Sequence, residues 1–245
     1  MQAPEAEPIR SVESCELNPF DRPALEVALR MREKGGGTVT ALSMGPESSA
    51  PSIYEAMAMG VDRGVLVCDP ALAGSDTLAT STVLAAAIKR LAPFELLLFG
   101  TRSADSDTGQ VGPQTAVLLD LPFVSSAISL ERKDTRLYVE HRADGFREKF
   151  ELLLPGALTI HPGALQPRDA GLMGIESAYE EGNLEKWGLE DLGLSPHHVG
   201  LKGSPTRVHA LSRVERVRQC EFISGSAEEQ ADQLVKRLVE SGLAG

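Results

Sequence analysis

The chain has 245 residues, of which 42% are hydrophobic, 24% charged and 4% aromatic. It carries 24 Lys and Arg against 35 Asp and Glu, a formal net charge of −11, so nucleic acid and anionic membrane surfaces are poor partners. No apolar run approaches the roughly 18 residues of a spanning helix. The polar start lacks the apolar core of a signal peptide, which favours a cytoplasmic location.

Charge is distributed unevenly and divides the chain into three stretches. Residues 1–160 have a net charge of −7, residues 161–194 of −5 and residues 195–245 of +1. We expect the first stretch to be an α/β domain and the second to be a long loop or linker.

Helix and strand patterns alternate through the first 120 residues. Apolar residues recur at helical spacing in 23–34, 51–59, 77–91 and about 113–119. Short apolar or β-branched runs that predict strands occupy 38–44, 64–68 and 95–99. The last of these, ELLLF, is bounded by Gly100 and predicts a central parallel strand buried on both faces. The order predicts an α/β fold, a Rossmann-like three-layer parallel sheet.

The rest of the chain is less regular. Residues 123–130, 136–142 and 147–154 predict an antiparallel or mixed addition to the sheet, closed by 157–160. Residues 161–194 show little periodicity and predict a long loop. Ser226 and Glu229 form a capping box that opens an amphipathic helix ended by Gly242.

The beginning of the fold lacks one usual feature. A doubly wound domain normally opens with a hydrophobic strand that leads into its ligand loop. Here no hydrophobic run precedes the first helix. We expect either an atypical sheet or a sequence that starts downstream of a natural first strand.

The segment most suited to binding a ligand follows Phe99. A loop at the carboxyl end of a parallel strand, before a helix, attracts phosphate through free N–H groups and the helix dipole. Ser106, Thr108 and Gly109 supply donors there, and Gly112 allows close backbone approach. The loop is neither a P-loop nor a G-x-G-x-x-G turn. An ordinary helix entry, capped by Asp107 or Thr108, is about equally favoured.

Two further segments have weaker signals. Asn18–Asp21 predicts a turn followed by a helix cap, and the cap is the favoured interpretation. Residues 200–207 (GLKGSPTR) contain Lys202, Ser204 and Thr206, which suit an anion, but a solvated turn is favoured.

The sequence contains few groups of residues that could act together in catalysis. The five histidines show no metal spacing, and no nucleophile motif is present. For Asp105 and Asp107, helix capping and solvation in a loop are more favoured interpretations than metal binding. For Trp187, packing is more favoured than stacking on a ligand. We predict no catalytic residue and no metal site. The sequence is typical of a protein that binds a cofactor and leaves the chemistry to it.

Several separated motifs, in order, resemble one family over nearly the whole chain. They are NPFDRPALEVALRMREKG, LSMGP, EAMAMGVDRGVLVCDP, LLLFGTRSADSDTGQVGPQTAVLLDLP and DLGLSPHHVGLKGSPT. The chain resembles the beta (small) subunit of electron transfer flavoproteins. The resemblance implies an αβ heterodimer that carries FAD. It accepts electrons from dehydrogenases and passes them to a membrane quinone oxidoreductase or another acceptor.

The resemblance also implies an organisation and a set of nucleotide contacts. Residues 1–160 would be the adenine-nucleotide-binding α/β domain, 161–194 a partner-recognition loop, and 195–245 an arm with a terminal helix docked on the alpha subunit. The implied contacts are Asn18, Pro19, Phe20, Asp21, Met44, Asp105, Ser106, Asp107, Thr108, Gly109, Gln110, Val111, Gly112, Pro113, Gln114, Thr115 and Ala116.

The family offers two ligands for the beta-subunit site. One branch holds AMP, and the bifurcating or nitrogen-fixation-associated branch holds a second FAD. Residues 107–113 and 203–206 resemble the second branch, so we favour FAD, with AMP a close second.

The chain departs from the family pattern in three places. The family's opening strand is missing, LQPR at 165–168 replaces the usual Asn-Glu-Pro-Arg loop, and SAYEEG at 177–182 replaces a lysine cluster. A loop of net charge −5 does not attract the same acidic partner surfaces. Two alternatives remain: a universal-stress-type nucleotide-binding module without a redox role, and a degenerate subunit that has lost nucleotide binding.

Overall fold

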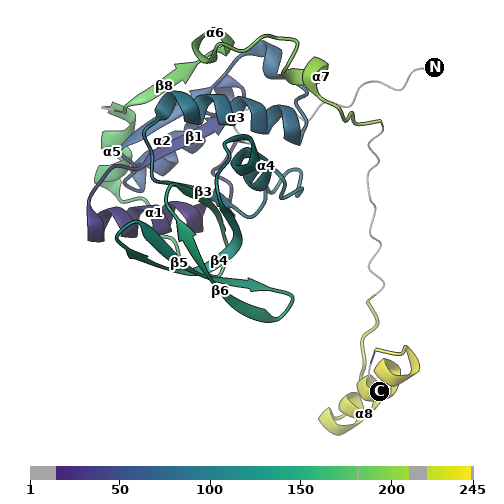
Figure 1. Ribbon diagram of the computed structural model, residues 1–245. Helices are drawn as coiled ribbons and strands as arrows, with labels where there is room; N and C mark the ends of the chain where they lie inside the picture. Colours follow the sequence, from purple (N-terminus) through teal and green to yellow (C-terminus); the bar gives the residue numbers. More distant parts are fainter. Residues whose placement is uncertain (1–14, 181, 210–219, 244–245) are drawn as a thin grey trace, which may run out of the picture. The chain divides into compact units, whose positions relative to one another are not determined.

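The computed structural model describes residues 15–180, 182–209 and 220–243 (Figure 1). The chain separates into two compact units. Of the described residues, the larger unit contains 15–180 and 182–209, and the smaller contains 220–243. Among the described residues, no helix combines the length and the apolar composition needed to cross a bilayer.

The larger unit alternates helices and strands. Its α-helices are α1 (Arg22–Gly35), α2 (Ala50–Ala58), α3 (Thr77–Leu91), α4 (Val111–Leu118), α5 (Leu172–Glu180), α6 (Leu189–Leu192) and α7 (Gly200–Gly203). Its strands are β1 (Thr40–Met44), β2 (Arg63–Val67), β3 (Leu96–Gly100), β4 (Phe123–Lys133), β5 (Arg136–Ala143), β6 (Phe146–Leu153), β7 (Gly156–Ile160) and β8 (Leu184–Trp187). Short 3-10 turns, η2 (Glu47–Ser49) and η3 (Pro70–Leu72), follow β1 and β2.

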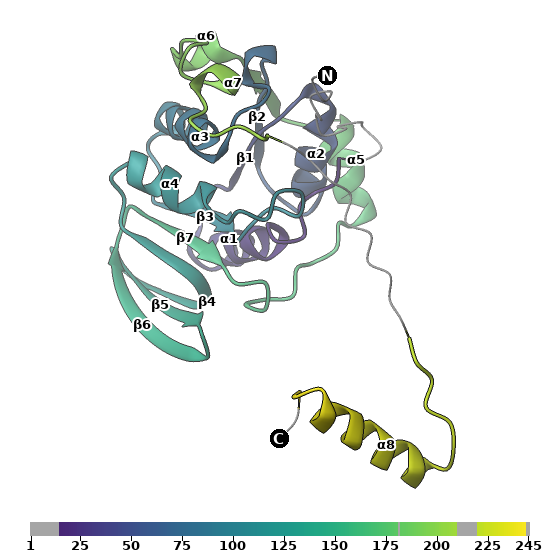
Figure 2. The ribbon, with the colours of Figure 1, turned by 90° about the vertical axis from the view of Figure 1, so that its right-hand side faces the viewer.

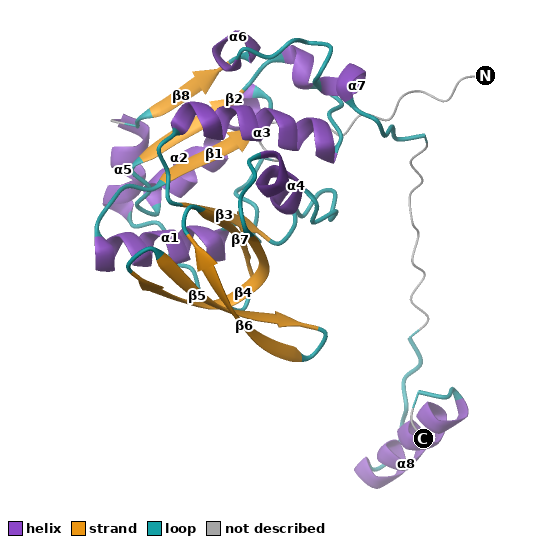
Figure 3. Cartoon of the chain, viewed as in Figure 1, coloured by secondary structure: helices purple, strands orange, loops and turns teal. Residues whose placement is uncertain are grey.

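The strands form two sheets between layers of helices. One sheet has the order β1-β2-β8 and is parallel throughout. The other has the order β3-β7-β4-β5-β6, in which β3, β7 and β4 are parallel and β5 and β6 continue antiparallel. Helices α3 and α4 lie on one side of the strands and α1, α2 and α5 on the other (Figure 2). This architecture confirms the α/β, Rossmann-like prediction, with its antiparallel addition (Figure 3).

One strand is not where the sequence places it. Among the described residues β3 pairs with β7 alone, so it is an edge strand and the prediction of a central strand is wrong. All five residues of β3 are half-buried, whereas all five of β7 are buried. The parallel strands are thus divided between two sheets, and β1, like β3, has a single strand neighbour in the described part of the chain.

The stretch 161–194, expected to be a long loop, contains regular structure. It contributes α5, β8 and α6, and β8 pairs in parallel with β2, about 120 residues earlier. Trp187 ends β8 and is 6% exposed among Val65, Val67 and Val83, which confirms its packing role. Local periodicity missed these elements because they are short and their partners are distant in sequence.

The smaller unit contains α8 (Ala227–Glu240). Its capping box is confirmed: Ser226 Oγ accepts from Glu229 N at 3.3 Å, and Glu229 Oε2 accepts from Ser226 N at 2.8 Å. Its apolar side chains remain exposed: Leu234, Val235 and Val239.

Candidate functional site

The end of β3 lies directly beneath a turn from the start of α1. A Cβ atom on Gly100 would lie 2.2 Å from Asp21 Oδ1 and 2.6 Å from the carbonyl oxygen of Phe20. Such distances are far below van der Waals contact, so this approach requires glycine. The strand end and the turn therefore form one surface.

The Asn18–Asp21 turn is hydrogen-bonded to the loop that follows β3. Asn18 Nδ2 donates to the carbonyl oxygen of Arg102 at 2.8 Å, and Asn18 Oδ1 accepts from Ala104 N at 3.2 Å. Asp21 Oδ1 accepts from Gly100 N at 2.9 Å. Two segments that the sequence predicts as separate ligand contacts are thus brought together.

Asp21 does not act as the helix cap that its position suggests. It occupies the N-cap position of α1, but its side chain makes no capping bond there. Its Oδ2 accepts from Asn18 Nδ2 at 3.0 Å instead. Desolvation by the surrounding protein raises the pKa of Asp21, against the hydrogen bonds of Asn18 and Gly100, which lower it. The Asp21 carboxyl group therefore connects the Asn18–Asp21 turn to the end of β3.

Arg102 is a site residue that sequence reasoning missed. Its guanidinium lies 4.4 Å from the centroid of the Phe20 ring, and its Nη1 lies 3.1 Å from Asp107 Oδ1. It is the only basic residue between Gly100 and α4, which is the signal that would have found it. A guanidinium beside the loop supplies positive charge suited to phosphate.

The start of α4 differs from the sequence prediction. The helix begins at Val111 with Gln110 in the N-cap position, so the alternative with Asp107 or Thr108 as cap is wrong. Pro113 is the third helical residue, not the first. The exposed loop residues before the helix are Arg102, Ala104, Asp105, Ser106, Asp107, Thr108 and Gln110. Val111 and Gly112 have first-turn N–H groups, which intrahelical bonding leaves available for an anion.

The loop has its own internal bonds. Ser106 Oγ lies 2.9 Å from Ser103 Oγ, and Asp107 N donates to the carbonyl oxygen of Ser103 at 3.0 Å. Asp107 and Gly109 both have positive φ, 54° and 63°. These features turn the chain back on itself over four residues before it enters α4, which leaves the hydroxyls at the surface.

The later residues of the predicted stretch face the interior. Gln114 Oε1 accepts from Ser81 Oγ at 3.2 Å, which fixes α4 against α3. Thr115 and Ala116 are fully buried. Among the described residues, Thr115 Oγ1 is the one buried side-chain oxygen or nitrogen without a hydrogen-bond partner.

Met44 lies apart from this loop in the sheet order. It ends β1, in the other sheet, and packs partly against the core around β2 and α3.

The segment 200–207 is tied to the start of α3. Thr206 donates to Asp76 Oδ2 from its N at 2.9 Å and its Oγ1 at 2.7 Å, while Ser204 Oγ accepts from Asp76 N at 2.7 Å. Asp76 also caps α3 by accepting from Ala79 N at 2.9 Å. Burial raises the pKa of Asp76, but these hydrogen bonds outweigh it and the net shift is downward. The hydroxyls proposed for an anion are therefore engaged.

The donor set at the end of β3 fits a phosphate-containing ligand. It combines helix N–H groups, exposed hydroxyls and one guanidinium in a loop held by the Asn18–Asp21 turn. In the described part of the chain, no three His, Cys, Asp or Glu side chains gather as a metal site would require.

Comparison with known proteins places the chain in a family. Residues 10–191 match the electron transfer flavoprotein domain. The chain is 39% identical over 222 residues to the electron transfer flavoprotein subunit beta of Thermoanaerobacterium thermosaccharolyticum, covering 91% of this chain and 85% of the relative.

Two other relatives have similar coverage. The caffeyl-CoA reductase-Etf complex subunit CarD of Acetobacterium woodii is 38% identical over 91% of this chain and 86% of its own. The FixA protein of Azotobacter vinelandii is 36% identical over 93% and 82%. These matches leave the universal-stress alternative without support. The chain belongs to the electron transfer flavoprotein family, as a beta (small) subunit close to the branch that contains FixA and CarD.

Proposed function

We propose that this small subunit binds a second FAD in the loop between β3 and α4, in addition to the FAD carried by the heterodimer. The observation that carries the proposal is the Asn18–Asp21 turn, hydrogen-bonded onto the end of β3. This turn holds together the two segments that the family resemblance implies as nucleotide contacts. A bound flavin takes up and releases electrons, so the chain needs no acid–base side chain of its own.

Each part of the loop has a distinct role in this proposal. Arg102 and the first-turn N–H groups of Val111 and Gly112 would hold the diphosphate. The hydroxyls of Ser106 and Thr108 would donate to the phosphate oxygens. AMP is the alternative ligand, since its single phosphate suits the same donors.

The experiment uses the heterodimer, purified with its alpha subunit. Denaturation and mass spectrometry of the released small molecules give the nucleotide content per heterodimer. Two FAD support the proposal, and one FAD with one AMP supports the alternative. Recovery of one FAD and no second nucleotide rejects the site. Arg102→Ala is expected to lower occupancy of the beta site alone, and Arg147→Ala, at an exposed ion pair with Glu140, is the matched control.

The electron donors proposed for the complex are dehydrogenases, and the acceptor a quinone oxidoreductase or another protein, in the cytoplasm. The proposed docking element is α5. Leu172 and Met173 begin this helix and are 83% and 82% exposed. Glu176 and Glu180 lie on the same helix, which suits a partner with an apolar pocket and basic surroundings.

The arm that begins near residue 195 is proposed to dock on the alpha subunit through α8. Leu234, Val235 and Val239 are 50%, 58% and 53% exposed, and they recur at helical spacing. An amphipathic helix with such a face gains stability when a partner groove covers it.

A further inference from the structure

A buried carboxylate lies on α1, outside the nucleotide loop. Glu26 is 1% exposed, between the buried apolar residues Ala24 and Val27. An ionised side chain is rarely buried this completely without partners.

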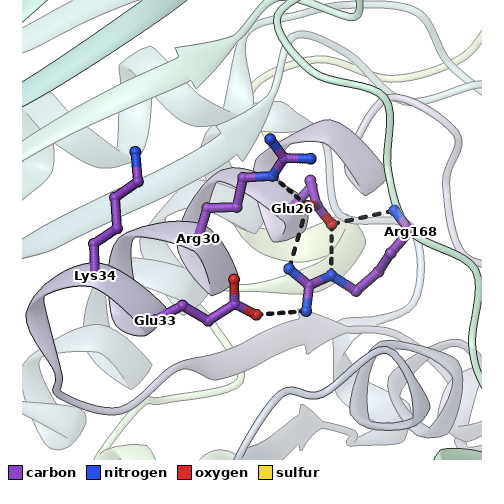
Figure 4. A pocket seen from close by; sticks show the side chains of 5 residues that line it. All are labelled: Glu26, Arg30, Glu33, Lys34 and Arg168. Atoms are coloured by element: carbon purple, nitrogen blue, oxygen red, sulfur yellow. Dashed lines mark hydrogen bonds and ion pairs between the residues drawn. The ribbon is translucent and has the colours of Figure 1, made fainter.

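Its partner comes from a segment far along the chain. Glu26 Oε2 accepts from the backbone N of Arg168 at 3.1 Å and from Arg168 Nε at 2.8 Å (Figure 4). Glu26 Oε1 accepts from Arg168 Nη2 at 3.2 Å and from Arg30 Nε at 2.6 Å. The same carboxylate therefore holds both the side chain and the main chain of Arg168.

A second acid completes the arrangement at the surface. Arg168 Nη1 donates to Glu33 Oε1 at 2.6 Å. Lys34 lines the same surface cavity of about 550 Å³. Because the carboxylates already engage Arg30 and Arg168, the cavity has few donors left for an external anion. The charged groups of this cavity bind one another and so hold Arg168 against α1.

The anchored segment leads directly into α5. Leu165 packs against the core beneath α1, and Ala170 packs against the cluster that contains Leu29. Leu172, the first residue of α5, follows Arg168 by four positions. Gly174, within α5, approaches α2 so closely that a Cβ there would lie 2.3 Å from the carbonyl oxygen of Ala58. The bonds to Arg168 thus fix where α5 begins, and the Gly174 contact fixes how it lies.

We propose that Glu26 is a positioning residue for partner docking: it holds Arg168 against α1 and so sets the position of Leu172 and Met173. The inference rests on the proposed role of α5 in docking. Glu26 is 1% exposed, and in this proposal it acts through the backbone and side chain of Arg168.

The test uses the purified heterodimer with Glu26→Gln, and Glu33→Gln as the matched control on the same arginine. Hydrogen exchange of peptides covering residues 165–175 is measured first, because it needs no electron donor. Glu26→Gln is expected to speed exchange there by about tenfold or more, with no change in β2 or β7. Glu33→Gln is expected to leave exchange near that of the unsubstituted protein. Unchanged exchange in Glu26→Gln, or an equal rise throughout the unit, would overturn the anchor.

The second measurement separates docking from folding. A purified dehydrogenase that reduces the unsubstituted heterodimer, itself reduced by its own substrate, serves as the electron donor, and flavin reduction is followed against donor concentration. Glu26→Gln is expected to raise KM about tenfold at unchanged kcat, while nucleotide content stays the same. Leu172→Ser tests the docking role itself. If Leu172→Ser raises KM and Glu26→Gln does not, the positioning role of Glu26 is rejected and the docking role of α5 is retained. If neither substitution changes KM, the docking role of α5 is rejected, and the hydrogen-exchange result alone tests whether Glu26 anchors Arg168.

A milder variant covers the case in which Glu26→Gln does not fold. Arg168→Lys keeps the charge but loses the planar donor pair. It is expected to show a smaller rise in exchange over the same peptides. No rise in Arg168→Lys would count against the anchor.

Discussion

Gly100 is the residue on which the geometry of the candidate site depends most directly. Its backbone N donates to Asp21, and its α-carbon lies against the turn. No other residue type fits that approach, because a Cβ would overlap both Asp21 and Phe20.

Gly100→Ala is expected to lower the free energy of unfolding by about 1–3 kcal/mol through overpacking. It also displaces the Asn18–Asp21 turn, so beta-site nucleotide is lost from the heterodimer. Gly35→Ala is the control, since nothing lies within 4 Å of the added Cβ there. Denaturant unfolding and nucleotide content check both. Equal stability of the two variants would contradict the close approach.

Glu26 makes stability depend on pH. Burial raises its pKa, but hydrogen bonds from Arg168 and Arg30 outweigh burial and lower the pKa to about 2, from an ordinary 4.5. A depressed carboxyl pKa stabilises the fold above the unfolded value, and that stability is lost as pH falls from about 4.5 through about 2. The contribution at neutral pH is about 3 kcal/mol.

The pH dependence is checked by unfolding at a series of pH values between about 6 and 3. Glu26→Gln is expected to flatten the acid side of the profile relative to the unsubstituted protein. Glu33→Gln, which removes a more exposed partner of Arg168, is expected to flatten it less. An unchanged slope in Glu26→Gln would show that the carboxylate is not held ionised.

At the scale of elements, the N-terminus of α3 holds the beginning of the arm. Asp76 both caps the helix and accepts two bonds from Thr206. Gly200 has φ of 61°, and a Cβ there would lie 2.0 Å from the carbonyl oxygen of Ala71. The short helix α7 is therefore pressed against the turn after β2, and Thr206 hydrogen-bonds the segment that follows α7 to the start of α3.

Thr206→Val removes the hydroxyl bond and leaves the cap of α3 intact. It is expected to cost about 0.5–1.5 kcal/mol of unfolding free energy and to speed hydrogen exchange in residues 200–209. Thr82→Val is the control, because the Thr82 hydroxyl bonds only locally, to Leu78 of the same helix. Equal exchange in both variants would mean that Thr206 does not hold the segment.

Elements with clear local periodicity could be predicted from sequence. Residues 77–91 were bounded correctly as α3, and the hairpins after Phe123 lie within a few residues of their predicted limits. α5 and β8 were missed because β8 is four residues long and is defined by pairing with β2. Sequence spacing does not encode that contact.

The candidate site could be predicted only in part, for a related reason. Composition indicates a phosphate-suited loop after β3, and family resemblance names its residues. The bonds from Asn18 to Arg102 and Ala104 join segments more than 80 residues apart, so no local pattern contains them. Its position predicts Asp21 as a helix cap, but its carboxylate accepts from Gly100 N and makes no capping bond.

At the scale of the whole molecule, the charged stretches of the sequence differ in the elements that they carry. The acidic stretch 161–194 carries α5, which is proposed to dock, and the near-neutral stretch 195–245 carries α8 with its exposed apolar face. Both helices have exposed apolar side chains, which suits the partner contacts proposed for them.

Substitution of the α8 face is expected to abolish assembly and leave the larger unit folded. Val235→Asp with Val239→Asp places two charges where a partner groove would cover them. Co-purification with a tagged alpha subunit checks the result, and circular dichroism confirms that the larger unit is intact. Lys236→Gln, on the same helix, is the control. Undiminished co-purification of the double variant would exclude α8 from the interface.

Within the described residues, β1 and β3 each have one side without a strand neighbour, which has a consequence for handling the protein. LLLFG and TALSM contain neither proline nor a charged residue, the usual devices that keep an edge strand from pairing with other chains. We therefore expect the isolated polypeptide to aggregate more readily during expression than a chain with charged edge strands. A strand that paired along either edge would protect it.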